Sequence, residues 1–274
     1  LLRFPHSLLL FCTLFLPAVA TAQSKPLQSK PLQSKPLQSK PLQDGRNQST
    51  GNPEPVLDPE LKQYGIYAAT APRAKPTAAV QTSLPLQFPK GSRIALIGNM
   101  LLERSQYFGH LESLLHQHAP GQRLQVRHLG WPADTVDLQP RPDNFADLQQ
   151  HLNHENVDVI LAAFGFNESF AGPNGAAAFE QSLRTYVDGL RTTAFNGESA
   201  PKIVLLSPIA SENIQGVAAA DMNNTNLNAY TEIMRRVAND LEVGFIDLFQ
   251  PTQAAMRSPG NDLTINGVHL NEAG

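Results

Sequence analysis

Four short segments hold the polar and glycine residues that are best suited to chemistry. They are Gly98-Asn99-Met100, Leu129-Gly130-Trp131, Gly165-Phe166-Asn167-Glu168 and Asn266-Gly267-Val268-His269. A histidine ring can exchange a proton near neutral pH, and amide groups or exposed backbone N–H groups can hold a negatively charged oxygen. The four segments are therefore candidates for acid–base and hydrogen-bonding chemistry if the fold brings them together.

The elements between these segments alternate in type. Apolar runs predict five strands, at residues 92–97, 124–128, 157–163, 202–207 and 244–248. Apolar residues at helical spacing predict helices around residues 107–115, 179–190 and 227–241. Strands that alternate with helices imply a parallel sheet covered on both faces. The first three segments directly follow the first three strands and the fourth lies beyond the fifth, so all four should meet at the carboxyl edge of the sheet.

The N-terminus has the pattern of a secretory signal peptide. Arg3 and His6 precede an apolar run at residues 8–19, and Ala20-Thr21-Ala22 offers a cleavage site. We therefore predict a signal peptide at 1–22 and a secreted or periplasmic protein with no stable membrane insertion after cleavage, the alternative being an uncleaved anchor. Cys12 is the only cysteine, so the mature chain has no disulfide, zinc–thiolate site or cysteine nucleophile.

A linker is predicted at residues 23–89. The unit SKPLQ occurs four times in tandem at 24–43, and polar, proline-bearing sequence follows. Such a repeat cannot build a packed core, and it predicts a disordered, extended spacer. Its lysines could instead contact a polyanion, and residues 57–69 could include a short helix. The formal net charge of −3 gives no basic field for nucleic acid, which we exclude as a partner.

The four segments, in this order and at these strand ends, resemble the SGNH (GDSL-type) hydrolase family. Its Gly-Asp-Ser block corresponds to Gly98-Asn99-Met100, its second-block glycine to Gly130, its Gly-x-Asn block to Gly165-Phe166-Asn167, and its Asp-x-x-His block to Asn266-Gly267-Val268-His269. The resemblance covers residues 90–274. It implies an α/β fold, namely a three-layer αβα sandwich with a five-stranded parallel sheet in flavodoxin-like order.

The resemblance also implies a set of roles. His269 would be the base, Gly130 and the Asn167 amide would hold the oxyanion, and the Met100 backbone N–H would be a third donor. Two replacements depart from the family. Met100 stands at the nucleophile position without a proton to lose, and Asn266 stands at the position of the acid without its charge.

Four further residues are candidates for substrate contact, namely Asn99, Glu103, Trp131 and Glu168. Glu103 could instead serve the opening turn of a helix, because the helix dipole favours acids there. Trp131 could be packing or a pocket wall, and Glu168 could tune the pocket or bond to local backbone. Asn167 could cap a turn after the third strand.

The family hydrolyses esters, so we expect an esterase-like domain for an acylated carbohydrate or a similar ester, with weak or altered activity. The alternative is a non-catalytic module that binds a glycan or ester, or a structural one, within a larger secreted protein with further domains. No cofactor is expected. His151 and His154 have no evident further ligand, so no metal is expected either. Because the sequence stops where the family begins a closing helix, we also expect a truncated C-terminal end.

Overall fold

The computed structural model describes residues 66–214, 219–258, 260 and 262–274. The predicted signal peptide, the SKPLQ repeat and residues 57–65 of the suggested short helix lie outside these residues. The fold described below is therefore that of the segment from residue 66 onward.

Five parallel strands form the central sheet. They are β2 (Arg93–Gly98), β3 (Gln125–His128), β4 (Val159–Ala163), β6 (Lys202–Leu206) and β7 (Gly244–Ile246), in the spatial order β3-β2-β4-β6-β7. This is the flavodoxin-like order. The predicted sheet is confirmed, with each strand within a few residues of its predicted bounds.

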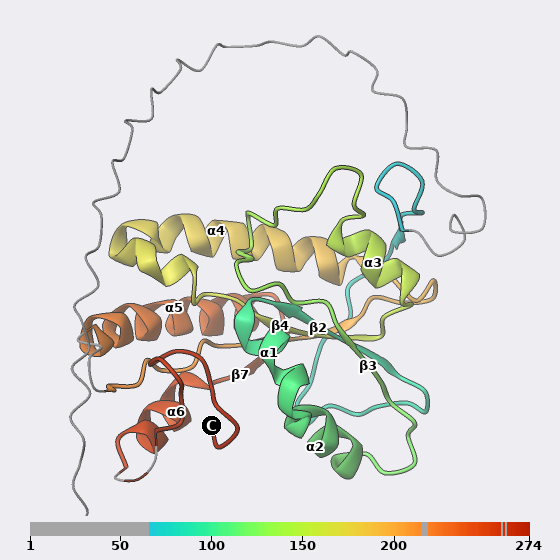
Figure 1. Cartoon of the computed structure of the whole chain (residues 1–274). Coiled ribbons are helices and arrows are strands. Elements are labelled where there is room, and N and C mark those ends of the chain that lie inside the picture. The colour runs from blue at the N-terminus through green and yellow to red at the C-terminus, as the bar shows by residue number, and fades with distance from the viewer. Residues whose placement is uncertain (1–65, 215–218, 259, 261) are drawn as a thin grey trace, which may run out of the picture. The chain divides into compact units, whose positions relative to one another are not determined.

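Helices cover the sheet on both faces (Figure 1). One face carries α3 (Leu148–His154), α4 (Gly172–Arg191) and α5 (Ala220–Asp240), and the other carries α1 (Met100–Phe108), α2 (His110–His118) and α6 (Phe249–Met256). A short helix η1 (Glu168–Ala171) precedes α4, and β1 (Lys75–Pro76) pairs with β5 (Thr193–Ala194) apart from the main sheet. The three-layer αβα sandwich is thus confirmed.

The continuous apolar runs of the strands follow from this double cover. In β2, Ala95 and Ile97 join the core beneath α4 and α5, while Ile94 and Leu96 join the core beneath α1 and α2. All four side chains are fully buried. A strand enclosed on both faces cannot alternate apolar and polar residues, which explains why the strands read as unbroken hydrophobic runs.

The helical region after β2 differs from its prediction. The single helix expected around residues 107–115 is two helices, because Gly109 adopts a left-handed conformation with φ of 68° and ends α1. The buried residue of α1 is Leu102, whereas Tyr107 is 63% exposed. Helices α3 and α6 were not predicted, since neither has a long apolar stripe.

Residues 66–89, which the sequence assigned to the linker, lie against the domain. The Thr82 hydroxyl accepts a hydrogen bond from the Ile203 backbone N–H at 3.0 Å, and Tyr67 forms a β-bridge with Phe145. The side chain of Phe88 packs on the core beneath α1 and α2. The packed domain therefore begins before the predicted boundary at residue 90. The sequence did not indicate this, because single side chains anchor the segment and it has no periodic apolar pattern.

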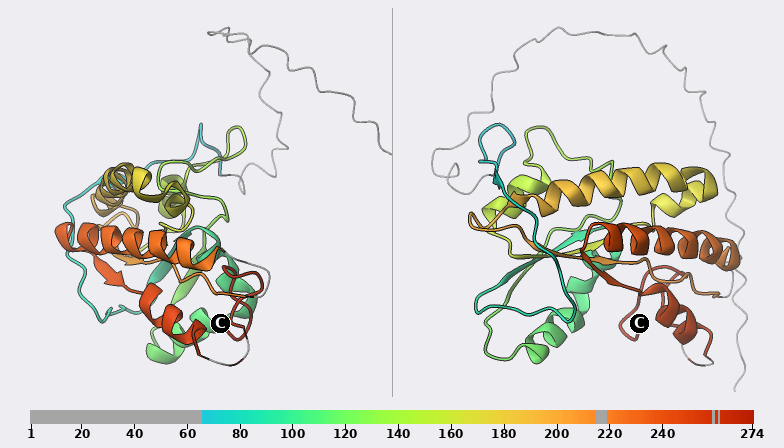
Figure 2. Two further views of the ribbon diagram at one scale, coloured as in Figure 1. Left: turned by 90° about the vertical axis from the view of Figure 1, so that its left-hand side faces the viewer. Right: turned by 180° about the vertical axis from the view of Figure 1, so that it is seen from behind.

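Figure 2 shows α1, α2 and α6 on the side of the sheet opposite α4 and α5. An apolar groove with a volume of 530 Å³ runs over this side, lined by Leu161 and Leu206 of the central strands and by Ile246 and Leu114 at its rim. Ile246 is 39% exposed and Leu114 is 61% exposed. Apolar side chains of the sheet therefore face a hollow on this side.

Among the described residues, no helix has both the length and the apolar character needed to cross a membrane.

Candidate functional site

The candidate site begins where β2 turns into α1. Gly98 has φ of 115°, and a Cβ atom placed on it would lie 2.0 Å from the Ala163 carbonyl oxygen. The Asn99 N–H donates to that oxygen at 3.1 Å, and the Asn99 Oδ1 accepts from the Leu101 N–H at 3.3 Å. Asn99 is thus the buried N-cap of α1, and Met100 is the first residue of the helix.

The second segment lies directly against this turn. The Trp131 N–H donates to the Gly98 carbonyl at 2.9 Å. A Cβ atom on Gly130 would be 3.1 Å from the Gly98 oxygen and 3.3 Å from the Glu103 backbone nitrogen. Within the described part of the chain, no acceptor faces the backbone N–H of Met100 or of Gly130. Gly130 therefore packs against the first turn of α1, and the N–H groups of Met100 and Gly130, both predicted as oxyanion donors, have no hydrogen-bond partner among the described residues.

The Met100 side chain joins the third and fourth segments. It packs, as Val268 does, against a buried apolar cluster that includes Phe166 and Phe249. Asn99, Met100, Phe166 and Val268 also line one narrow crevice. Phe166 adjoins Asn167 and Val268 adjoins His269, so parts of the first, third and fourth segments gather around Met100. That Met100 stands at the family's nucleophile position stays a prediction.

Asn266 orients the ring of His269. The Asn266 Oδ1 lies 2.9 Å from the His269 Nδ1 and also accepts from the His269 backbone N–H at 3.0 Å. Because an amide oxygen can only accept, this contact assigns the proton to Nδ1 and leaves Nε2 with a free lone pair. The pair keeps the geometry of a base and its orienting partner but lacks the negative charge.

Two charged residues of α1 act on the same ring. The pKa of His269 is lowered by burial and by the nearby Arg104 guanidinium, and Glu103 opposes this shift. Arg104 also donates to the Leu270 carbonyl at 3.3 Å. The Glu103 carboxylate accepts from the Tyr107 hydroxyl at 2.7 Å. The Arg104 side chain thus lies beside the loop that carries His269, and burial together with this charge favours the neutral imidazole.

Asn167 differs from its expected role. Its Nδ2 donates to the Asp134 carbonyl at 3.0 Å and to the Pro132 carbonyl at 3.3 Å. A side-chain amide has only two hydrogens, so both are directed at the loop that follows β3. In this structure Asn167 fastens that loop and would have to release one carbonyl in order to bind an oxyanion.

Glu168 and Trp131 also have structural partners. The Glu168 carboxylate accepts from the Gly165 N–H at 2.8 Å and from the Val136 N–H at 3.0 Å, and burial raises its pKa. Of the two roles suggested for Glu168, the bond to backbone is the one observed. Trp131 is 41% exposed, with the Arg141 guanidinium 4.4 Å from its ring centroid.

Glu212 was missed by the sequence reasoning. It is 4% exposed, and its carboxylate accepts from the Leu263 N–H at 2.9 Å, the Thr264 N–H at 2.8 Å and the Thr264 hydroxyl at 2.6 Å. Its own N–H donates to the Gly267 carbonyl at 2.7 Å. Glu212 therefore fixes the loop that carries Asn266 and His269. Its position just after a predicted strand was the only available signal.

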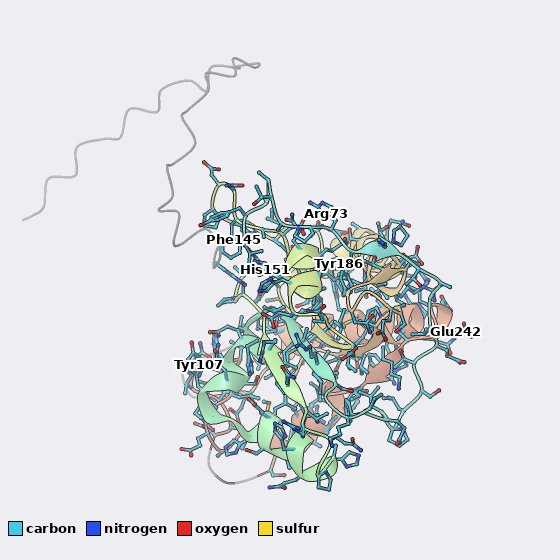
Figure 3. The ribbon with its side chains drawn as sticks, turned by 90° about the vertical axis from the view of Figure 1, so that its right-hand side faces the viewer. Arg73, Tyr107, Phe145, His151, Tyr186 and Glu242 are labelled. Atoms are coloured by element: carbon cyan, nitrogen blue, oxygen red, sulfur yellow. The ribbon has the colours of Figure 1, made fainter. Side chains whose placement is uncertain are left out.

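The loop after Gly130 is also braced by contacts that the sequence reasoning did not predict, one of them made by His151, which had been considered only as a metal ligand. Asp134 is 3% exposed and forms a two-pronged ion pair with Arg141, with N–O distances of 2.8 and 2.6 Å. Phe145, near the end of the same loop, and His151 of α3 lie side by side, with ring centroids 5.1 Å apart (Figure 3). The loop is thus held rigidly beside the site. The sequence spacing of these residues gave no indication that Asp134 pairs with Arg141 or Phe145 with His151.

No metal centre emerges in the part of the chain that the structure describes. Groups of three or more His, Cys, Asp or Glu side chains that could hold an ion do not occur there. His151 lies against Phe145 instead of beside further ligands. The expectation that the protein needs no metal or cofactor stays a prediction.

Comparisons with solved structures agree with this fold. The catalytic mutant of Axe2, an acetylxylan esterase from Geobacillus stearothermophilus, aligns with a TM-score of 0.52 and 15% identity over 69% of this chain and 90% of that one. LAE5, an α/β hydrolase from the metagenome of Lake Arreo, Spain, aligns with a TM-score of 0.50 and 18% identity over 68% and 90%. These likenesses show a shared fold. No curated protein matches the chain.

The sequence comparison goes further than the fold. Residues 103–274, more than half of the chain, match the GDSL-like Lipase/Acylhydrolase family. The match includes Gly130, Asn167 and His269 and begins just after Met100. The expected relationship is confirmed: this chain belongs to the GDSL-like lipase/acylhydrolase family.

Proposed function

We propose that the domain is an esterase-like module that binds an acyl ester, such as an acylated carbohydrate, at the N-terminus of α1 and hydrolyses it weakly. The observation that carries this proposal is the 2.9 Å contact between His269 Nδ1 and Asn266 Oδ1, beside the free N–H groups of Met100 and Gly130. The fold shared with an acetylxylan esterase supports a carbohydrate ester as the substrate.

The proposed reaction uses water as the nucleophile. His269 Nε2 takes a proton from a water molecule as the water oxygen attacks the ester carbonyl carbon. The negative charge that develops on the carbonyl oxygen is held by the Met100 and Gly130 N–H groups. The intermediate then collapses, the bond to the alkoxide breaks, and His269 returns the proton to the leaving oxygen.

Three features limit this reaction. Met100 offers no hydroxyl for an acyl-enzyme, Asn266 cannot stabilise an imidazolium by charge, and the Asn167 amide is engaged by the loop. In a serine protease the change of the triad aspartate to asparagine lowers turnover by about 10⁴. Loss of the whole triad there still leaves about 10³–10⁴ over water.

The decisive experiment restores the two missing groups. Met100→Ser supplies a hydroxyl, and Asn266→Asp supplies the charge. We expect the double variant to hydrolyse p-nitrophenyl acetate with a turnover up to about 10⁴ above that of Met100→Ser alone. Initial rates of the wild type, both single variants and the double variant give the comparison, and acetylated xylan tests the carbohydrate ester.

His269→Ala is the control in both backgrounds. It should remove the gained activity of the double variant and any residual activity of the wild type. A double variant that is folded but as inactive as Met100→Ser alone would contradict the proposal, because it would mean that the remaining geometry cannot hold the transition state.

A second candidate function is a binding module without catalysis. The packing of the Met100 thioether into the Phe166 and Val268 cluster, together with the engaged Asn167 amide, supports it. Saturable binding of an acetylated oligosaccharide that His269→Ala weakens, with no release of acetate by the wild type, would favour this role over hydrolysis.

A further inference from the structure

A second cavity is lined by residues of the N-terminal half of α5 and of α6, two helices that lie next to each other in Figure 1. Its volume is 620 Å³, within the range of about 300–1,000 Å³ that is usual for small-molecule sites. Its lining is rich in primary amides: Asn213, Asn224, Asn228, Gln250 and Gln253. Neither the catalytic proposal nor the family assignment uses this cavity.

Ser211 gives an independent sign of a ligand. It lines the cavity, is 3% exposed, and its Oγ has no hydrogen-bond partner within the described residues. Its backbone is fixed on both sides, since Asn224 Oδ1 accepts from the Ser211 N–H at 2.7 Å and Asn224 Nδ2 donates to the Ser211 carbonyl at 2.8 Å. Buried hydroxyls are nearly always hydrogen-bonded, so this one is positioned for a partner outside the protein.

The chemistry of the lining selects the class of ligand. Primary amides both donate and accept hydrogen bonds, as hydroxyl groups do, and carry no charge. The two charged residues of the lining, Asp221 and Arg257, have opposite signs. Met256 is partly exposed and adds an apolar side chain that suits the C–H face of a sugar ring, whereas Phe249 is only 2% exposed and closes the cavity from below.

We propose that this cavity is a binding site for a neutral, unmodified sugar. The amides and the Ser211 hydroxyl would bond to its hydroxyl groups, and Met256 would contact a ring face. The proposal does not rest on hydrolysis at His269, because the sugar bound here carries no ester and none of the residues of the Asn266–His269 pair lines the cavity.

Titration calorimetry on the whole chain with four unacetylated probes tests the proposal: xylotetraose, cellotetraose, maltotetraose and chitotetraose. We expect saturable binding of at least one. Ser211→Ala and Asn228→Ala should each raise its Kd by about threefold to tenfold, the effect of one neutral hydrogen bond. Asn228 is exposed, so its substitution leaves the fold intact even if Ser211→Ala does not.

Two controls define the site. Gln181→Ala removes an exposed amide on α4 and should leave the Kd unchanged. His269→Ala should also leave it unchanged while removing any esterase activity, so failure of the two proposals can be told apart. The sugar site is overturned if none of the probes binds, if neither cavity variant changes the Kd, or if His269→Ala abolishes binding.

Discussion

The imidazole of His269 lies between an orienting amide and a nearby positive charge. Asn266 holds its Nδ1, while burial and Arg104 lower its pKa and Glu103 opposes them. A general base must be unprotonated in order to act, so a lowered pKa keeps His269 competent at mildly acidic pH. The same charge makes an imidazolium costly, and Asn266 cannot offset that cost as an aspartate would.

Substitution of the charged neighbours should move the titration of His269 in opposite directions. Arg104→Gln removes a positive charge, which favours the imidazolium and should raise the pKa toward its ordinary value. Glu103→Gln should lower it further. NMR titration of the imidazole signals, assigned with His269→Gln, measures both shifts. Arg235→Gln, on α5, is the control, and an unchanged midpoint in Arg104→Gln would contradict the inferred coupling.

The loop that carries the Asn266–His269 pair depends on one buried carboxylate. Glu212 accepts three hydrogen bonds from Leu263 and Thr264, and a buried donor left without its acceptor costs about 1–3 kcal/mol. Glu212→Ala should therefore lower the free energy of unfolding by about 2–3 kcal/mol. Hydrogen exchange of residues 263–269 should also accelerate.

Glu198→Ala is the matched control for this change, because Glu198 is exposed. It should alter neither the stability nor the exchange. If Glu212→Ala lowers the stability without faster exchange in residues 263–269, the carboxylate does not act through this loop.

The turn from β2 into α1 requires glycine at position 98 for two reasons. Its φ is positive, and an added Cβ would collide with the Ala163 carbonyl. Gly98→Ala should lower the free energy of unfolding by about 3 kcal/mol or more. Gly197 has φ of 79° with open space around it, so Gly197→Ala isolates the conformational penalty of about 1–2 kcal/mol. Thermal unfolding of both variants separates the collision from backbone strain. Equal losses in the free energy of unfolding would show that the backbone at Ala163 moves aside and that the collision has no cost.

At the scale of the whole molecule, the two faces of the sheet differ in their cover. The α4 and α5 face is closed, whereas the α1, α2 and α6 face has a 530 Å³ apolar groove. Large exposed apolar patches favour association.

The secreted or periplasmic location stays a prediction, since it depends on residues 1–22.

A charge at the rim of the groove should make this chain less prone to associate. Leu114, at 61% exposed, lies at the rim, and Leu138, at 64% exposed, lies outside it. Leu114→Lys should lower the fluorescence of the dye ANS and the concentration-dependent mass seen in sedimentation, because it breaks the apolar surface. Leu138→Lys should leave both nearly unchanged. Equal effects of the two variants would mean that the groove has no special role.

Periodicity and strand-end position were sufficient to predict the sheet, its two-sided cover and the gathering of four segments at one edge. These features are local: an apolar run of four to six residues defines a strand wherever its partners lie. The same reasoning predicts that Met100 and Asn266 depart from the family, because the chemistry of a side chain is known from its type. It failed at Gly109 and in residues 66–89, where single residues break or anchor the chain without a pattern.

What only the tertiary structure decided is which polar group meets which. The Asn167 amide is used by the carbonyls of Pro132 and Asp134, Glu212 holds a loop about fifty residues further along the chain, and Ser211 is left without a partner inside a cavity. Hydrogen bonds form between groups within about 3 Å in space, whatever their distance in sequence. Composition and the order of the segments therefore specified the fold, and the packing of distant loops determined which polar groups are engaged and which are available to a ligand.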